Sequence, residues 1–141
     1  MEENNMRFGT YIHQKRFDDP RILTMRDVAQ HLGISITYVS EVENLRRGPF
    51  NGERLTKLAL FLNLSDEETA LMFDLASREN HRVPYDIEDT LLYGEVGKLA
   101  RYALRQSKSG FINEEDWRAF LRQIEEKKKE QAKATTQFQR D

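Results

Sequence analysis

A segment near the amino terminus presents polar and methyl-bearing side chains on one side of a predicted helix. A helix over residues 36–45 turns Val39 and Val42 toward a core, so that other positions face away from it. The positions facing away are Ile36, Thr37, Ser40, Glu41 and Asn44. Hydroxyl, carboxylate and methyl groups on such a helix can contact base edges in the major groove of DNA. This face is therefore a candidate surface for reading DNA.

The residues that position this face predict two short helices joined by a tight turn. Ala29 is small at the point where the helices would approach most closely, and Gly33 permits the chain to turn. Ser35 is suited to cap the second helix, because its hydroxyl can accept a hydrogen bond from the first turn. Together these features predict a helix-turn-helix over Met25–Asn44, which indicates binding to DNA.

Apolar residues at helical spacing predict an all-α fold for the whole chain. We expect a five-helix DNA-binding domain over residues 1–80, followed by a linker over residues 81–85 that contains Pro84. Two amphipathic segments within residues 86–131 predict a C-terminal helical hairpin. Residues 132–141 lose the apolar face, and we expect them to be disordered.

Composition predicts a soluble, cytoplasmic protein. Hydrophobic residues make up 38% of the chain and charged residues 33%. The absence of cysteine excludes disulfides and thiolate metal sites. No apolar run reaches the roughly 18 residues needed to cross a membrane, and the first residues do not resemble a signal peptide. No catalytic or metal-ligand spacing is evident, so we expect neither an enzyme nor a cofactor.

The distribution of charge indicates that a single copy would bind DNA weakly. The net charge is −2, with nine Lys and Arg against eight Asp and Glu in residues 1–60, and thirteen against sixteen in residues 61–141. Neutralisation of phosphates supplies most of the non-specific affinity for DNA. We therefore expect a homodimer.

The predicted hairpin carries apolar faces that two helices cannot bury between themselves. The candidate dimer or partner interface consists of Leu92, Val96, Leu99, Trp117, Phe120, Leu121 and Ile124. One hypothesis is that it joins two copies of a transcriptional regulator. The alternative is an antitoxin-like or anti-repressor-sensitive interaction module, in which the hairpin binds a partner protein.

The stretches TMRDVAQHLGISITYVSEVENLRRGP and ERLTKLALFLNLSDEE resemble the Cro and phage-repressor type of helix-turn-helix regulators, often called the XRE family. The resemblance extends over residues 6–76. It implies a transcriptional regulator, most often a repressor, that binds an inverted-repeat operator in double-stranded DNA as a homodimer. The helix over residues 36–45 would lie in the major groove.

The resemblance also implies roles for individual positions. The base-contacting residues would be Ile36, Thr37, Ser40 and Glu41. The phosphate-contacting residues would be Met25, Arg26, Gln30, Asn44, Arg46 and Arg47. Arg16 and Glu43 would form a structural ion pair.

The chain departs from the family pattern at three places. Many members have glutamine at the position of Met25, and glutamine or arginine at the position of Ile36. The turn between the first two predicted helices, FDDPRIL, is also longer than usual. The base contacts of better-known members therefore cannot be transferred to this chain.

Overall fold

The structure, a computed structural model, describes residues 5–140, with side chains to residue 137. The described residues form helices and no strand, which confirms the predicted all-α fold. The chain divides into two compact units, Met1–Asp89 and Thr90–Asp141, called here the N-terminal and C-terminal units. None of the described helices is both long enough and apolar enough to cross a membrane.

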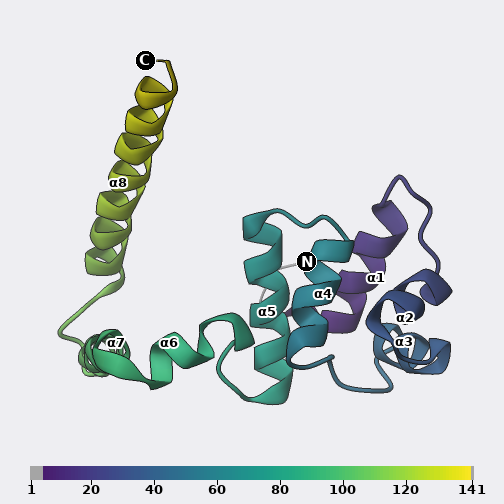
Figure 1. The fold of residues 1–141 in the computed structure, drawn as a ribbon. Helices are drawn as coiled ribbons and strands as arrows, with labels where there is room; N and C mark the ends of the chain where they lie inside the picture. The colour runs from purple at the N-terminus through teal and green to yellow at the C-terminus, as the bar shows by residue number, and fades with distance from the viewer. Residues whose placement is uncertain (1–4, 141) are drawn as a thin grey trace. The chain divides into compact units, whose positions relative to one another are not determined.

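The N-terminal unit is built from five helices packed around one core (Figure 1). In chain order they are α1 (Phe8–Asp18), α2 (Met25–Leu32), α3 (Ile36–Glu43), α4 (Glu53–Phe61) and α5 (Asp66–Asn80). Helix α1 packs against α3 and α5, while α2 packs against α3 and α4. Helix α3 is thus held between α1 and α2, and α5 packs on the same α1.

Fully buried side chains from several elements meet in the core. Phe8 on α1 lies edge-on to Phe50, with ring centroids 5.9 Å apart. Phe50 belongs to the loop between α3 and α4, so its burial fixes this loop to the bundle. Met72 and Leu75 of α5 are also completely buried. Burial of such large apolar groups is the main source of stability for the unit.

Gly9 marks the closest approach between α1 and α3. A Cβ atom at this position would lie 2.1 Å from the carbonyl oxygen of Val42 and 2.9 Å from a methyl carbon of Leu45. Only glycine allows the two helices to come this close without a shift of backbone. The spacing between α1 and α3 therefore depends on this one residue.

The N-terminal unit continues past the end of α5. His81 ends the helix in a left-handed conformation (φ 51°), and the Arg82 N–H donates to the carbonyl oxygen of Ser77. The chain then forms a 3-10 helix, η2 (Tyr85–Ile87), that packs against α5. Residues 81–85, predicted as a linker, and the residues up to Asp89 thus belong to this unit. The left-handed turn at His81 gave no sequence signal of its own.

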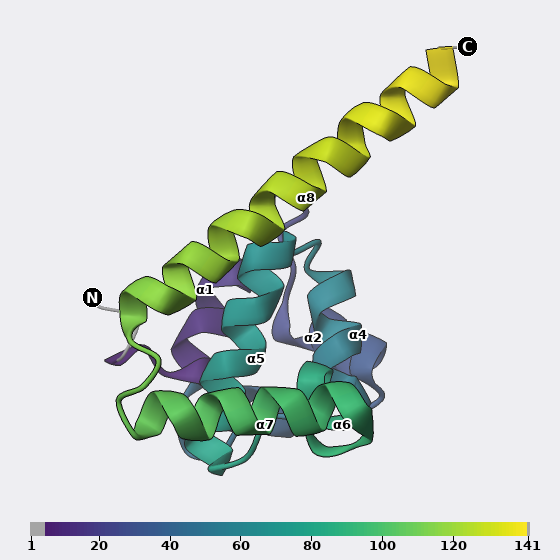
Figure 2. The ribbon, with the colours of Figure 1, turned by 90° about the vertical axis from the view of Figure 1, so that its left-hand side faces the viewer.

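The C-terminal unit consists mainly of α7 (Gly94–Lys108) and α8 (Glu114–Arg140), two long helices shown in Figure 2. A short helix, α6 (Glu88–Leu92), precedes them and spans the boundary between the units. Gly94 has a φ of 75°, and this separates α6 from α7 within residues 86–131, which were predicted to form a hairpin of two helices. Helix α8 continues through most of the segment predicted to be disordered.

Among the described residues, α7 and α8 do not pack side by side along their lengths, which differs from the predicted hairpin. They are connected instead at the turn between them. The indole Nε1 of Trp117 donates to the Ser107 hydroxyl at 2.8 Å, and this hydroxyl donates to the carbonyl oxygen of Ile112 at 2.9 Å. This arrangement leaves the apolar faces of the unit without a partner helix along most of their length.

Candidate nucleic-acid interface

Local hydrogen bonds and one glycine fix the start of α2 and the turn that joins α2 to α3. The Thr24 hydroxyl accepts from the Asp27 N–H, and the Asp27 carboxylate accepts from the Thr24 N–H, which forms a capping box. The backbone hydrogen bond from Thr24 lowers the pKa of Asp27. Gly33 ends α2 with a φ of 69°, and the Ser35 hydroxyl caps α3 by accepting from the Tyr38 N–H at 3.0 Å. Each end of the turn is thus fixed locally.

The two sides of α3 differ strongly in exposure. Val39 and Val42 are buried against the bundle, as the sequence predicts. Ile36 and Thr37 are exposed, while Ser40 and Glu41 are partly exposed. The structure therefore gathers the four predicted base-contacting residues on the solvent side of one helix.

Ser40, a predicted base-contacting residue, is hydrogen-bonded to Asn44, a predicted phosphate-contacting residue. The Asn44 side-chain amide donates to the Ser40 carbonyl oxygen at 2.8 Å and to the Ser40 hydroxyl at 3.1 Å. The Ser40 carbonyl oxygen also accepts from the Asn44 backbone N–H at 2.9 Å, so Asn44 binds the last turn of α3 through both its backbone and its side chain. The Ser40 hydroxyl keeps its own hydrogen available as a donor.

Arg47, which follows α3 in the chain, contacts two side chains of that helix, Tyr38 and Glu41. Its guanidinium carbon is 3.6 Å from the centre of the Tyr38 ring, and its Nη1 is 3.7 Å from a Glu41 carboxylate oxygen. Arg54 of α4 stands 5.6 Å from the same ring centre. Such cation–π contacts hold an arginine in place while leaving N–H groups free to bind an anion. The arginine also offsets the negative charge of Glu41.

The opposite end of α3 is tied to α1 through Glu43. Arg16 donates to both carboxylate oxygens of Glu43, at 2.8 and 2.9 Å, and to the carbonyl oxygen of Leu23 at 2.9 Å. His13 Nδ1 lies 2.6 Å from the same carboxylate, whose side chain is only 2% exposed. The hydrogen bonds with Glu43 raise the pKa of Arg16 above its ordinary value. The structure thus brings together the predicted pair and adds a third member, His13.

Comparison with known proteins agrees with this geometry. A family described as helix-turn-helix matches residues 17–68, which include α2, α3 and α4. The N-terminal unit contains a DNA-binding domain of this family. The match supports a domain of the Cro and phage-repressor (XRE) type and a role as a DNA-binding regulator of transcription. The comparisons with curated proteins and with solved structures gave no match.

The helix-turn-helix domain places most of the predicted phosphate-contacting residues at the surface. Arg26, Gln30, Arg46 and Arg47 are exposed on or beside the motif. Met25 is an exception, because its side chain is partly buried and packs against the core. Met25 therefore has only its backbone N–H, at the start of α2, to direct toward a phosphate.

Two residues around the helix-turn-helix escaped sequence reasoning. His13 has no neighbour in the sequence that indicates its contact with Glu43, which lies 30 positions away on another helix. Arg54 follows the α3–α4 loop, and its position over Tyr38 depends on the path of that loop. A signal for this path did exist, since Phe50 is the one aromatic residue of the loop and is buried.

Proposed function

We propose that this helix-turn-helix regulator is a transcriptional repressor that binds an inverted-repeat operator as a homodimer. In this proposal α3 lies in the major groove of each half-site, with the half-sites about one helical turn apart. The observation that carries the proposal is the division of α3 into a buried underside and an exposed face. The side chains that read bases are Ile36, Thr37, Ser40 and Glu41.

The character of the exposed face favours particular base contacts. The Ile36 side chain and the methyl group of Thr37 fit a thymine methyl, and the hydroxyls of Thr37 and Ser40 can hydrogen-bond base edges. Glu41 can accept from cytosine N4, and its contact with Arg47 lowers the repulsion from neighbouring phosphates. The face has no arginine or glutamine of its own. We therefore expect modest discrimination at each base pair, supplemented by binding to phosphates.

Phosphate binding falls to side chains around the motif. Arg26 and Gln30 on α2, and Arg46 and Arg47 after α3, are exposed on either side of the recognition helix. The contact of Arg54 with Tyr38 adds it to this set. Contacts of this kind fix the register of the protein on DNA without reading sequence. The set comprises Met25 through its backbone, Arg26, Gln30, Asn44, Arg46, Arg47 and Arg54.

The C-terminal unit supports the homodimer part of the proposal. Leu92, Val96, Leu99, Phe120 and Leu121 are exposed, while Trp117 and Ile124 are partly buried. Several large apolar side chains exposed within one small unit are a feature of protein–protein interfaces. A second copy provides an identical apolar surface, which is the requirement for a two-fold interface.

Charge along α8 also fits self-association. Residues 114–126 carry five acidic and two basic side chains, whereas residues 127–140 carry five basic and one acidic. Two copies of α8 running antiparallel would place each acidic half beside a basic half. A parallel arrangement would place like charges together, which is unfavourable.

Binding of the full chain to DNA upstream of its own gene, measured by gel shift at low salt, tests the proposal. We expect a shift that a Thr37→Ala variant weakens by roughly 1–3 kcal/mol on the best site. A Thr136→Ala variant changes a hydroxyl on α8 and should bind like the original protein. A folded, dimeric protein that shifts no upstream fragment would contradict the proposal.

The exposed apolar side chains also favour a second candidate function, in which the C-terminal unit binds a different protein. Val96→Glu and Leu99→Glu in the full chain separate the two. Loss of self-association together with loss of operator binding supports the repressor dimer. Loss of a co-purifying protein with unchanged operator binding supports the antitoxin-like or anti-repressor-sensitive module.

A further inference from the structure

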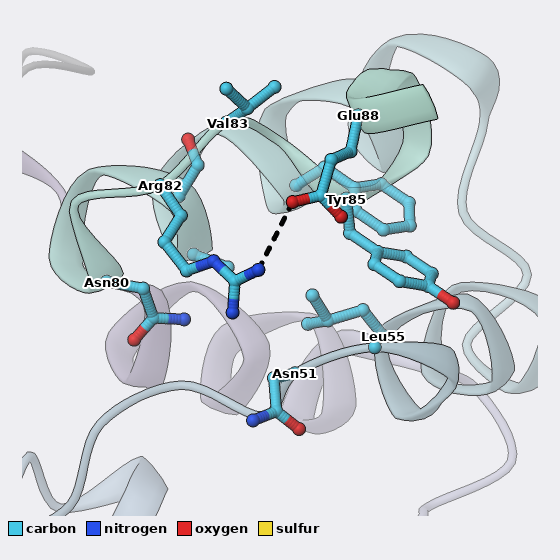
Figure 3. A pocket seen from close by; sticks show the side chains of 11 residues that line it. Asn51, Leu55, Asn80, Arg82, Val83, Tyr85 and Glu88 are labelled. Carbon is cyan, nitrogen blue, oxygen red and sulfur yellow. Dashed lines mark hydrogen bonds and ion pairs between the residues drawn. The ribbon is translucent and has the colours of Figure 1, made fainter. Parts of the chain in front are cut away.

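A pocket on the N-terminal unit lies away from the exposed face of α3. Its volume is about 420 Å³, within the range of small-molecule sites. It is formed where the segment after α5 folds back toward the start of α4, so residues from three parts of the chain meet there (Figure 3). The helix-turn-helix motif itself contributes no residue to the lining.

Apolar side chains form one part of the pocket lining. Leu55 of α4 and Phe73 and Ala76 of α5 form the inner surface, with Val83 and Tyr85 from the segment that folds back. Leu55 and Phe73 are otherwise part of the core, so the floor is rigidly supported. The ring of Tyr85 remains partly exposed beside it. This surface suits an apolar side chain of moderate size.

A pair of opposite charges stands at the edge of the same pocket. Arg82 Nη2 lies 3.2 Å from Glu88 Oε1, as the dashed line in Figure 3 shows. Within the described part of the chain the Arg82 guanidinium has no other hydrogen bond or ion pair, and this contact is long for a charge-assisted hydrogen bond. Both groups therefore retain hydrogen-bonding capacity for a ligand.

Two amides add further polar groups beside this pair. Asn51 lies just before α4 and Asn80 is the last residue of α5, and both line the pocket. Across residues 5–137 neither side-chain amide makes a hydrogen bond with another side chain or with backbone. Both residues are exposed, so their amides are accessible to a ligand with donors and acceptors near its charged end.

We propose that this pocket binds a small α-amino acid with an apolar side chain. The α-carboxylate would pair with Arg82 and the α-ammonium with Glu88, while the apolar side chain lies on Leu55, Phe73 and Tyr85. A purely anionic ligand would meet Glu88, and a purely cationic one would meet Arg82, so the pair favours a zwitterion. This site is separate from the proposed DNA contacts, and it can be tested without DNA.

The test is titration of the isotope-labelled full-length protein with L-phenylalanine, L-leucine and L-tryptophan, followed by NMR. We expect at least one of them to shift the amide signals of Asn51, Ser77 and Asn80 in a saturable way. N-acetyl-phenylalanine and phenylalaninamide, which each lack one charge, should bind at least about tenfold more weakly than phenylalanine. This comparison distinguishes a free amino acid, which carries both charges, from the end of a peptide, which carries only one of them.

Two variants and a matched control complete the experiment. Arg82→Gln and Glu88→Gln should each weaken binding at least about tenfold. Arg82 and Glu88 form an exposed contact, so both variants should fold normally. Arg118→Gln removes an arginine from α8 and should bind as the original protein does. Absence of saturable shifts with all three amino acids at roughly 10 mM, near the weakest affinity of practical use, would overturn the proposal. Unchanged binding in both pocket variants would overturn it as well.

Discussion

The two units of the chain differ in how far they bury their apolar side chains. In the N-terminal unit, side chains from all five helices and from the α3–α4 loop are buried in one core. In the described part of the C-terminal unit, Gly97 is the one fully buried residue, and Leu99 remains 62% exposed. The first unit thus has the packing of a domain that is stable alone. The second leaves most of its apolar side chains exposed.

The ion pairs of the two units differ in the same way. Glu43 is buried and bound by Arg16 and His13. The Glu126–Lys129 pair on α8 is separated by 3.9 Å, and both of its side chains are 70% exposed. A buried pair is costly to break because one charge is left behind, whereas an exposed pair contributes little. Equal substitutions in the two units should therefore have unequal effects.

The largest expected effect comes from Glu43→Ala. This change leaves the Arg16 guanidinium without its carboxylate and detaches α3 from α1, which should lower the free energy of unfolding by about 3–5 kcal/mol. Amide hydrogen exchange in α1 and α3 measures the loss. Glu126→Ala is the control and should change stability by less than about 1 kcal/mol. Equal losses in the two variants would contradict the comparison.

Gly9→Ala should have the next largest effect. The added methyl group would meet the Val42 carbonyl oxygen at 2.1 Å, so α1 and α3 must move apart. Overpacking of this kind costs about 1–3 kcal/mol. Thermal unfolding by circular dichroism measures it. Gly48→Ala has space, with its nearest neighbour 3.8 Å away, and should be almost neutral.

Ile22→Gly should stabilise the N-terminal unit by about 1 kcal/mol. Ile22 is β-branched, has a φ of 57° and is 84% exposed, so its side chain gives little packing in return for its strained backbone. Glycine adopts this conformation without the steric cost. The midpoint of urea unfolding should rise. Ile87→Gly is the control, because Ile87 is exposed and has no positive φ. If Ile22→Gly lowers the midpoint as much as Ile87→Gly does, Ile22 is not strained.

Acid should weaken the N-terminal unit through two carboxylates at the edge of α1 and on α5. Hydrogen bonds from Arg21 lower the pKa of Asp19 to about 2, and Lys15 and Ser65 lower that of Glu68 to about 2. Because both pKa values are below those of the unfolded chain, their contribution is complete above about pH 4.5 and is lost as the pH falls toward 2. Urea unfolding across this range should show a slope that Asp19→Asn with Glu68→Gln reduces. An unchanged slope in this double variant would contradict the assignment.

Leu99→Glu should have the smallest effect on stability and still change the assembly. Since Leu99 is exposed, the free energy of unfolding of an isolated chain should change by no more than about 0.5 kcal/mol. Sedimentation should nevertheless show loss of the proposed dimer. Trp117 is the one tryptophan of the chain, so its fluorescence follows the C-terminal unit alone. Leu60→Glu alters an exposed leucine of α4 and should leave self-association unchanged.

How far the sequence could predict the structure differs between the units for physical reasons. The helix-turn-helix depends on local signals, namely the caps at Thr24 and Ser35 and the turn at Gly33, and these act within a few residues of where they stand. The break at Gly94 was missed because the apolar spacing continues across it. The association of His13 with Glu43 depends on how α1 crosses α3, which no local pattern encodes.

The pocket was also beyond sequence prediction. It requires the left-handed turn at His81 and the return of Arg82 and Glu88 toward Leu55. Histidine and arginine after a helix are equally compatible with a solvated linker, which is what the composition predicted. A residue in a left-handed conformation without glycine can be recognised only once the backbone is known.

The contact of Arg47 with Glu41 and Tyr38 has a consequence for ions in solution. An arginine that leaves a carboxylate to reach a phosphate exchanges one anionic partner for another, and Glu41 must then attract a cation or a base amine. Binding thus releases fewer net counterions than the number of arginines near the groove indicates. The affinity for DNA should accordingly fall less steeply with potassium concentration than in a protein whose arginines begin unpaired.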